Sequence, residues 1–329
     1  MPRQQPTMTV TPHDTGSTAL PDGRRIGWAG FGDPSGDVVF WFHGTPGARA
    51  QVPADLDSEA KRRRLRVIGV ERPGTGDSTE HHYEQVVDFA DDLLGVADEL
   101  GIDRFAAVGL SGGGPFVLAC AAKAPDRMTT GVVLGGVAPV RGPDLVVSHM
   151  LGLRVLSPLV ERVQAPLSDA IGAVIRRIAP YGHPILEAFF LLTWGDWRDM
   201  RTNPDTKHQL IADLVDAARR SGLRAPMHDL VLFGREWGFE LNDVKIPITF
   251  WGGTNDVIVP YLHAERQAKR VPGARLRTVE GRGHFAGFTN VDDVLDAVRA
   301  EWPVVRPAPV ARKKAPQSAK KKAPARKRA

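Results

Sequence analysis

The hexapeptide Gly109-Leu110-Ser111-Gly112-Gly113-Gly114 places a serine at a turn crowded with glycine. The apolar residues 105–108 before it are typical of a buried strand, and residues 115–122 after it are typical of a helix. A GxSxG pattern between a strand and a helix predicts a turn that exposes a nucleophilic serine hydroxyl. The hexapeptide alone leaves a second interpretation open, a glycine turn with an uninvolved serine, because the chain contains 34 glycines.

Such a turn needs glycine for a steric reason. To hold the Ser111 hydroxyl clear of the sheet the backbone must be strained, and side chains at positions 109 and 113 would collide with their neighbours. The amide of Gly112 falls at the start of the following helix, where unpaired N–H groups and the positive end of the helix dipole can meet a developing oxyanion. We therefore expect Gly112 to contribute to an oxyanion hole.

The composition indicates a globular protein with an uneven charge distribution. The 329 residues, of which 42% are hydrophobic, suffice for one large α/β domain or two ordinary ones. The formal net charge is +5, but ten basic residues and no acidic residue lie in 303–329, and the rest of the chain has 33 basic and 38 acidic residues. Cys120 is the single cysteine, which excludes an intrachain disulfide and a cysteine-based metal site, and its apolar neighbours favour a core position.

Strand and helix patterns alternate in two parts of the chain, which predicts the α/β class with a doubly wound, mostly parallel sheet. The stretch 24–31 alternates apolar and polar residues and is expected to be an outer antiparallel strand. Further strands are predicted at 38–42, 65–70, 105–108, 131–137, 248–251 and 275–279, and helices at 55–64, 86–100, 115–122, 261–271 and 291–302.

The alternation stops between about 141 and 240, where apolar residues recur at helical spacing. Helical patterns occur there at 145–163, 170–178, 185–192 and 210–218. The chain is thus expected to consist of a core in two parts, 19–140 and 241–302, with a helical cap at 141–240 inserted between them.

The two ends of the chain are expected to be disordered. Residues 1–18 lack the continuous apolar region of a signal peptide, and residues 303–329 form a basic Lys/Arg/Ala/Pro tail. No apolar run is long enough for a transmembrane helix, so we expect a cytoplasmic enzyme.

A serine nucleophile needs a base, and the base needs an acid that fixes its tautomer. Asp256 follows the predicted strand 248–251, and His284 follows the predicted strand 275–279. Both lie just beyond the carboxyl ends of strands, the edge at which open parallel sheets bind ligands.

Five motifs in order make the chain resemble the α/β-hydrolase superfamily, in its capped esterase and haloperoxidase-like branch. The resemblance covers about 19–302. It rests on His43-Gly44-Thr45-Pro46-Gly47, Glu71-Arg72-Pro73-Gly74-Thr75-Gly76-Asp77-Ser78, the Ser111 turn, Gly252-Gly253-Thr254-Asn255-Asp256-Val257-Ile258-Val259-Pro260, and Gly283-His284-Phe285. It implies the α/β-hydrolase fold with an inserted helical cap.

The resemblance also implies the roles of the site residues. Ser111 would be the nucleophile, His284 the general base and then acid, and Asp256 the carboxylate that orients His284. The backbone amides of Thr45 and Gly112 would form the oxyanion hole. Neither a cofactor nor a metal is expected.

The serine at the turn is unlike the aspartate of haloalkane dehalogenases and epoxide hydrolases. The turn also lacks the tryptophan that follows the serine in proline iminopeptidases. What remains is attack on an acyl carbon of an ester, thioester, lactone or amide, or cleavage of a C–C bond next to a carbonyl. The mainly apolar cap favours a small or medium hydrophobic acyl substrate, and its aromatic residues could line the pocket or pack the cap: Phe189, Phe190, Trp194 and Trp197.

Other polar residues have structural interpretations. We expect His43 to brace its loop rather than act as a second base, Arg72 to tie loops together, and His263 to be a surface or packing residue of a helix. Asp144 and Asp243 are rival carboxylates, but neither follows a predicted strand.

Two other functions stay open. The chain could be a non-catalytic binding protein of the same fold, or a cofactor-free haloperoxidase that forms a peracid with the same three residues. The tail at 303–329 could bind nucleic acid or an acidic partner weakly, or it could be a solvated extension, and it has no aromatic residue to stack on bases.

Overall fold

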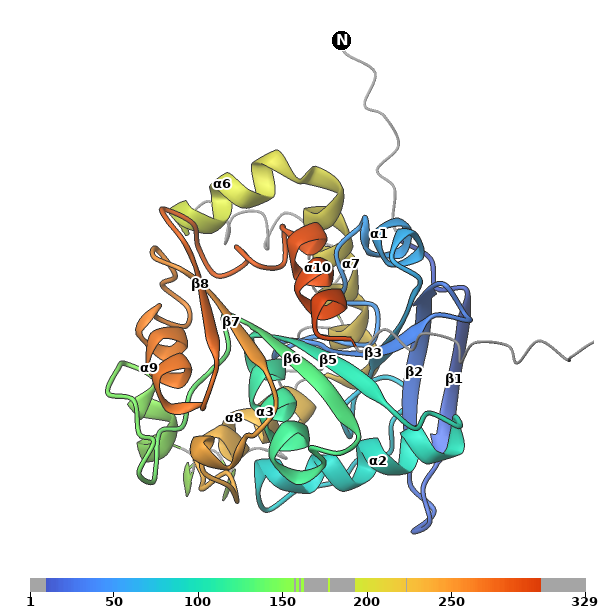
Figure 1. Ribbon diagram of the computed structural model, residues 1–329. Coiled ribbons are helices and arrows are strands. Elements are labelled where there is room, and N and C mark those ends of the chain that lie inside the picture. Colours follow the sequence, from blue (N-terminus) through green and yellow to red (C-terminus); the bar gives the residue numbers. More distant parts are fainter. Residues whose placement is uncertain are drawn as a thin grey trace, which may run out of the picture.

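The computed structural model describes residues 10–156, 158–159, 161–162, 177, 193–222 and 224–302. Its centre is an eight-stranded sheet in the order β1-β2-β4-β3-β5-β6-β7-β8 (Figure 1). β2 pairs antiparallel with both β1 and β4, and the other neighbours are parallel, which confirms the predicted fold class. The strands are β1 (Asp14–Ala19), β2 (Arg25–Gly32), β3 (Asp37–Phe42), β4 (Leu65–Val70), β5 (Phe105–Leu110), β6 (Met128–Leu134), β7 (Ile248–Gly253) and β8 (Arg275–Val279).

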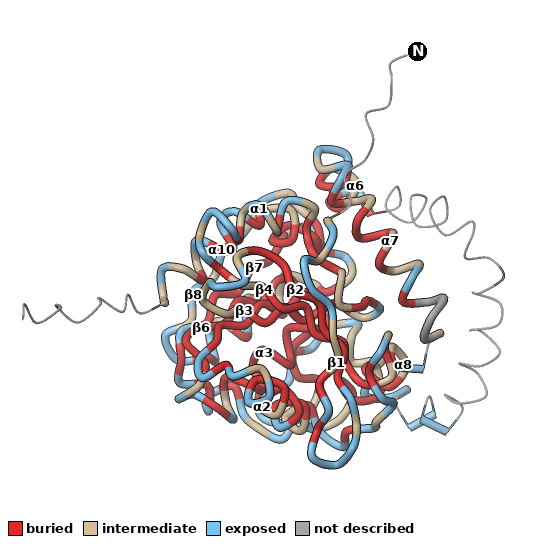
Figure 2. Tube along the Cα trace, turned by 90° about the vertical axis from the view of Figure 1, so that its right-hand side faces the viewer, coloured by how far each residue is buried: buried red, intermediate tan, exposed pale blue. Residues whose placement is uncertain are grey.

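Helices cover both faces of this sheet, and each face has its own apolar core. On one side lie α2 (Phe89–Glu99), preceded by the short turn η1 (Val86–Asp88), α3 (Gly114–Lys123) and α9 (Leu262–Arg270). On the other side lie α1 (Leu56–Arg62) and α10 (Val291–Ala300). In Figure 2 the buried residues concentrate along the strands and the helix faces that meet them.

The continuous apolar run in β3 follows from this sandwich. Phe40 packs edge-to-face against Phe105 in the first core, at a centroid distance of 5.0 Å. Its neighbour Trp41 points to the opposite face and meets Phe288 in the second core, at 6.2 Å. Successive residues of a strand point to opposite faces, so a strand buried on both faces must be apolar throughout.

The edge of the sheet differs from the sequence expectation. β1 begins at Asp14, so the prediction of disorder for 1–18 is wrong from that residue on, and β2 is not the outer strand. The side chains of β2 hold those of β1: Arg25 donates to Ser17 Oγ at 2.6 Å, and Trp28 Nε1 donates to Thr18 Oγ1 at 3.2 Å. The polar sequence of β1 hid this strand, because its pairing depends on β2.

The described part of the cap includes the helices α6 (Trp194–Thr202), α7 (Pro204–Ser221) and α8 (Arg224–Phe233). The predicted helix at 210–218 is part of α7, whereas α6 and α8 were not expected. Residues 151–156 are helical, so the helix predicted at 145–163 begins later than expected. The helices predicted at 170–178 and 185–192 lie outside the described residues, except for position 177, and the tail at 303–329 lies entirely outside them.

The cap helices pack on both cores. Leu210 and Ile211 of α7 belong to the second core, and Phe233 of α8 belongs to the first. A short turn, η4 (Leu241–Asp243), leads back from the cap to β7. Within the described ranges, no helix is both long and apolar enough to cross a bilayer.

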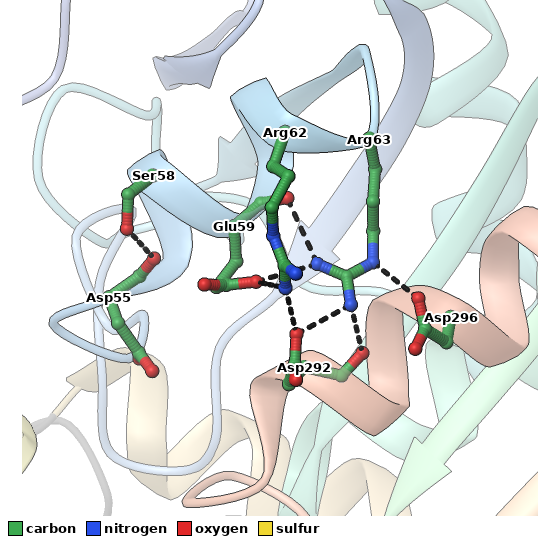
Figure 3. A network of polar contacts seen from close by, with 7 residues as sticks. All are labelled: Asp55, Ser58, Glu59, Arg62, Arg63, Asp292 and Asp296. Carbon is green, nitrogen blue, oxygen red and sulfur yellow. Dashed lines mark hydrogen bonds and ion pairs between the residues drawn. The ribbon is translucent and has the colours of Figure 1, made fainter.

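A network of charges fastens α1 to α10 on the outer side of the second core (Figure 3). Arg63, just after α1, donates to Asp292 Oδ1 at 2.5 Å and to Asp296 Oδ1 at 2.6 Å, both on α10. It also bonds Glu59 Oε2 at 2.7 Å, and Arg62 pairs with the same Glu59 and Asp292 carboxylates. These contacts join two helices that are more than 200 residues apart.

Candidate active site

Ser111 lies where the sequence pattern predicts, between β5 and α3, on the short 3₁₀ turn η2 (Ser111–Gly113). Its φ is +52°, a left-handed conformation that is strained for a residue with a side chain. A Cβ placed on Gly109 would lie 2.5 Å from the Gly113 carbonyl oxygen, and one on Gly113 would lie 2.4 Å from the Phe42 carbonyl oxygen. Only glycine fits these positions, which confirms the steric argument made from the sequence.

Asp256 and His284 form a buried pair at the ends of β7 and β8. His284 Nδ1 donates to Asp256 Oδ2 at 2.7 Å, and the other oxygen of Asp256 accepts the backbone N–H groups of Ile258 and Val259 at 2.9 and 2.8 Å. The carboxylate can only accept, so Nδ1 carries the proton and Nε2 has a free lone pair. This is the tautomer that a general base needs.

The pKa of His284 is raised above its ordinary value. Burial alone would lower the pKa, because it disfavours the imidazolium. The charge of Asp256, its hydrogen bond and the charge of Asp196 outweigh this effect. The site thus stabilises the imidazolium that forms when His284 takes up a proton.

Two consecutive glycines after β6 lie near His284 and near the backbone of Ser111. A Cβ on Gly135 would lie 3.1 Å from His284 Nδ1, and one on Gly136 would lie 3.7 Å from the Ser111 carbonyl oxygen. Gly135 has φ +57° and leaves the strand, so β6 ends at Leu134 and not at 137 as predicted. Among the described residues no hydrogen bond joins Ser111 to His284, and such bonds commonly close only when substrate is bound.

Thr45 and Gly112, the predicted oxyanion-hole residues, are neighbours. A Cβ on Gly112 would lie 2.4 Å from Thr45 Oγ1. The Thr45 hydroxyl donates to Asp229 Oδ2 of α8 at 2.7 Å, so its side chain is held by the cap. The amide of the adjacent Gly44 donates to Gln51 Oε1 at 2.6 Å.

Arg72 ties these loops together, as we expected. Its guanidinium donates to the carbonyl oxygens of His43 at 2.6 Å and Gly44 at 2.8 Å, and it pairs with Asp229 at 2.7 Å. Both charged side chains are buried. The network therefore connects the loop at 43–47 to the cap.

The two other histidines named from the sequence have structural roles. His43 donates through Nδ1 to the Gly44 carbonyl oxygen at 2.7 Å, and burial together with the charge of Arg72 holds its pKa well below the ordinary value. His263 is buried in α9, accepts the Ala138 N–H at 3.0 Å and contacts Ser148 Oγ at 2.7 Å. Burial lowers the pKa of His263 to about 4, so it remains neutral at pH 7.

The rival carboxylates are occupied elsewhere. Asp144 accepts the Leu241 N–H at 2.7 Å, and Asp243 accepts the Glu240 N–H at 2.9 Å.

In the cap, Trp194 is 71% exposed and stacks on Trp197, while Phe189 and Phe190 lie outside the described residues. The stacked pair gives no support for a pocket lining by Trp194.

The sequence did not point to two acidic residues of α6 that lie against the His284 loop. Asp196 accepts the Phe285 N–H at 3.1 Å, and Asp199 pairs with Arg282. Their spacing of three residues near a helix start was the only signal, and it is common on solvated helices.

A cavity of about 520 Å³ lies next to Trp237, and none of the predicted site residues lines it.

Known proteins share this fold. The family model described as "alpha/beta hydrolase fold" matches residues 37–155. The chain is 26% identical over 230 residues to a putative carbamate hydrolase, RutD, of Caulobacter sp. (strain K31), covering 69% of this chain and 75% of that protein. It is 24% identical over 294 residues to a probable proline iminopeptidase of Leptolyngbya boryana, covering 84% and 89%.

A solved structure gives the same result for the fold. The esterase RhEst1 from Rhodococcus sp. ECU1013 superimposes with a TM-score of 0.62 at 19% identity, over 87% of this chain and 97% of that one. The matched part of that esterase is nearly its whole length. The strand order, the Ser111 turn and the matched family model together show that the chain has the α/β-hydrolase fold.

Proposed function

We propose that the protein is a serine hydrolase that cleaves an ester or related acyl bond through an acyl-enzyme on Ser111. One observation carries the proposal: a serine with φ +52° stands beside a loop on which a buried Asp256–His284 hydrogen bond fixes the histidine tautomer. A bystander serine would have no reason to adopt a strained conformation at this edge of the sheet.

The first half of the reaction forms the acyl-enzyme. His284 Nε2 takes the proton of Ser111 Oγ as Oγ attacks the substrate carbonyl carbon, and the carbonyl oxygen gains the negative charge. The amides of Thr45 and Gly112 stabilise this oxyanion, and each such donor contributes about 3 kcal/mol in other hydrolases. The imidazolium then protonates the leaving group, and the acyl group stays on Ser111.

The second half releases the acid. His284 accepts a proton from water, the hydroxide oxygen attacks the acyl carbon, and collapse of the second tetrahedral intermediate returns the proton to Ser111 Oγ. Asp256 stays ionised throughout and stabilises the imidazolium each time it forms. Ser111 and His284 are the two residues that exchange protons in this scheme, while Asp256 and the two amides stabilise the charges that form.

The substrate is proposed as a small or medium hydrophobic acyl compound. The similar proteins carry the names carbamate hydrolase, iminopeptidase and esterase, and these differ in the leaving group. All three names fit attack on a carbonyl carbon, so the comparisons support the acyl step and leave the leaving group open.

A fluorophosphonate probe tests the proposal, because phosphonylation needs the nucleophile, the base and the oxyanion hole together. We expect the wild type and the Ser58→Ala control to be labelled and Ser111→Ala to remain unlabelled. Ser58 lies on α1 and bonds only the Asp55 carbonyl oxygen in the described structure, at 2.9 Å. If the wild type is not labelled, the serine hydrolase proposal is wrong.

A series of p-nitrophenyl esters of increasing acyl length then measures the substrate range. A maximum of kcat/KM at short or medium chains supports the proposed substrate class. Labelling by the probe without hydrolysis of any ester would favour amides, thioesters or lactones.

A further inference from the structure

Helix α6 of the cap approaches the His284 loop, residues 282–285, backbone to backbone. A Cβ on Gly195 would lie 2.7 Å from the Gly283 nitrogen and 2.8 Å from its Cα. From the other side, a Cβ on Gly283 would lie 2.3 Å from Asp196 Oδ1. Two glycines facing each other allow this contact, and a side chain at either position would separate the helix from the loop.

Two carboxylates of α6 hold four consecutive residues of this loop. Asp196 Oδ1 accepts the Phe285 N–H at 3.1 Å, and the His284 amide also hydrogen-bonds this carboxylate. Asp199 pairs with the Arg282 guanidinium and accepts a hydrogen bond from the Gly283 amide. We call Asp196 and Asp199 the acidic clamp.

The clamp is costly to bury. Asp196 is 0% exposed and Asp199 is 1% exposed, and burial raises the pKa of both carboxyls. The Oδ2 atoms of both residues have no hydrogen-bond partner among the described residues. A cap helix held only by apolar packing would avoid this cost, since an unsatisfied buried polar group destabilises by about 1–3 kcal/mol.

We propose that Asp196 is a positioning residue for His284, and that the acidic clamp makes the geometry of the catalytic histidine depend on the docking of α6. The inference rests on the proposed function. Asp196 touches the backbone of the histidine loop and not the reacting atoms. When α6 is displaced, the loop loses the acceptors of its amides, and His284 loses the frame that aims Nε2 at Ser111.

The two clamp residues differ in what they do to the charge at His284. The charged groups that face His284 are Asp256, from the loop after β7, and Asp196, from α6. Behind them, His263 of α9 is near enough to Asp256 for its pKa to respond to that charge, and Arg282 neutralises Asp199. Removing the charge of Asp196 should therefore lower the pKa of His284, whereas removing that of Asp199 should not.

This difference gives a matched pair of variants, Asp196→Asn and Asp199→Asn, which keep a carbonyl oxygen in place of the carboxylate. The assay is hydrolysis of the best p-nitrophenyl ester as a function of pH. For Asp196→Asn we expect kcat to fall by about tenfold with KM nearly unchanged, because positioning acts on the chemical step. The acidic limb of the pH profile of kcat should move to lower pH by about half a unit.

For Asp199→Asn we expect a smaller fall in kcat and no movement of the acidic limb. Asp205→Asn changes an exposed acid of α7 outside the clamp and should leave both quantities unchanged. A pH profile and kcat of Asp196→Asn equal to those of wild type would overturn the positioning role.

Amide hydrogen exchange of residues 282–285 tests the clamp without any assay of activity. We expect faster exchange in Asp196→Ala than in wild type, and no change in Asp205→Asn. If Asp196→Ala does not fold, Gly195→Ala carries this measurement, because its side chain separates α6 from the loop, and unchanged exchange in that variant contradicts the clamp. If fluorophosphonate does not label the wild type, the proposed function is wrong. The exchange rates of residues 282–285 then still show whether the acidic clamp holds the loop.

Discussion

The Ser111 turn and the His284 loop reach the same site by different means. The supports of Ser111 lie in the core: Gly109 and Gly113 clear the space around the turn, and the strands β3 and β5 form its floor. The His284 loop is held by Asp256 and by α6 of the cap, and α6 lies about 90 residues earlier in the chain. The proposed nucleophile is thus fixed by local sequence, and the proposed base is fixed by tertiary contacts.

The cap therefore does more than cover the site. It contacts the histidine loop through α6, the Ala48 amide through Asp213 of α7, and the Thr45 hydroxyl through Asp229 of α8. All of these contacts use carboxylates that the core encloses. The comparison predicts that damage to the core turn lowers stability, and that damage to the contact between α6 and the His284 loop lowers activity first.

The largest effect should follow from removing the carboxylate that fixes the tautomer of His284. Asp256→Asn keeps the shape of the side chain but no longer stabilises the imidazolium, and kcat should fall by about 10⁴-fold. Steady-state hydrolysis of the best p-nitrophenyl ester measures this. The rival carboxylate variant Asp243→Asn should stay within about twofold of wild type, and a fall of less than tenfold in Asp256→Asn would remove Asp256 from its proposed role.

The next effect concerns the pH dependence of stability through the cap contact of Asp213. Burial raises the pKa of Asp213 to about 7, although the Ala48 and Ala50 amides act in the opposite direction. The folded protein therefore binds this proton more tightly than the unfolded chain does. The stabilisation is complete below about pH 4 and is lost as the pH rises through about 7.

Urea denaturation at pH 5 and pH 8 measures this contribution. In wild type the group should lower the free energy of unfolding by about 3 kcal/mol between these two pH values. In Asp213→Asn this decrease should be absent, while the other titrating groups contribute equally to both proteins. Parallel pH dependences of the two proteins would show that Asp213 ionises normally.

A pair of glycine variants compares the two loops directly. A Cβ at Gly113 would meet the carbonyl oxygens of Phe42 and His43 at 2.4 and 2.9 Å, so Gly113→Ala should lower the free energy of unfolding by about 2 kcal/mol. Gly195→Ala meets the edge of the His284 loop, and we expect a smaller loss of stability with a clear fall in kcat. Urea denaturation and ester hydrolysis of both variants test this expectation. If the two variants lose stability and kcat to the same extent, the contrast between the Ser111 turn and the His284 loop is wrong.

The smallest effect should come from the network between α1 and α10. Arg63→Ala removes contacts to partly exposed carboxylates, so the free energy of unfolding should fall by about 1 kcal/mol or less, and less at high salt. The rate of ester hydrolysis should not change, because the network lies away from the site. A fall in kcat here would mean that activity responds to general loosening of the core.

Much of the core could be predicted from the sequence because its signals are local. The bounds of β4 and β8 match the predicted 65–70 and 275–279. β6 begins three residues before its prediction because Thr129 and Thr130 look polar, yet their hydroxyls donate to the carbonyl oxygens of Phe105 and Pro247. Polar residues whose hydroxyls are hydrogen-bonded in this way can lie inside a strand, but the partner carbonyls are known only from the fold.

The sequence by itself determined the order of strands and helices in the core, the glycine-lined turn of Ser111 and the places of Asp256 and His284 after their strands. Only the tertiary structure decided which acids of the cap matter: Asp196, Asp199, Asp213 and Asp229. In the sequence they look like ordinary residues of solvated helices. They are buried against the loops of the proposed site because the cap folds onto the core, and burial depends on packing between segments that are far apart in the chain.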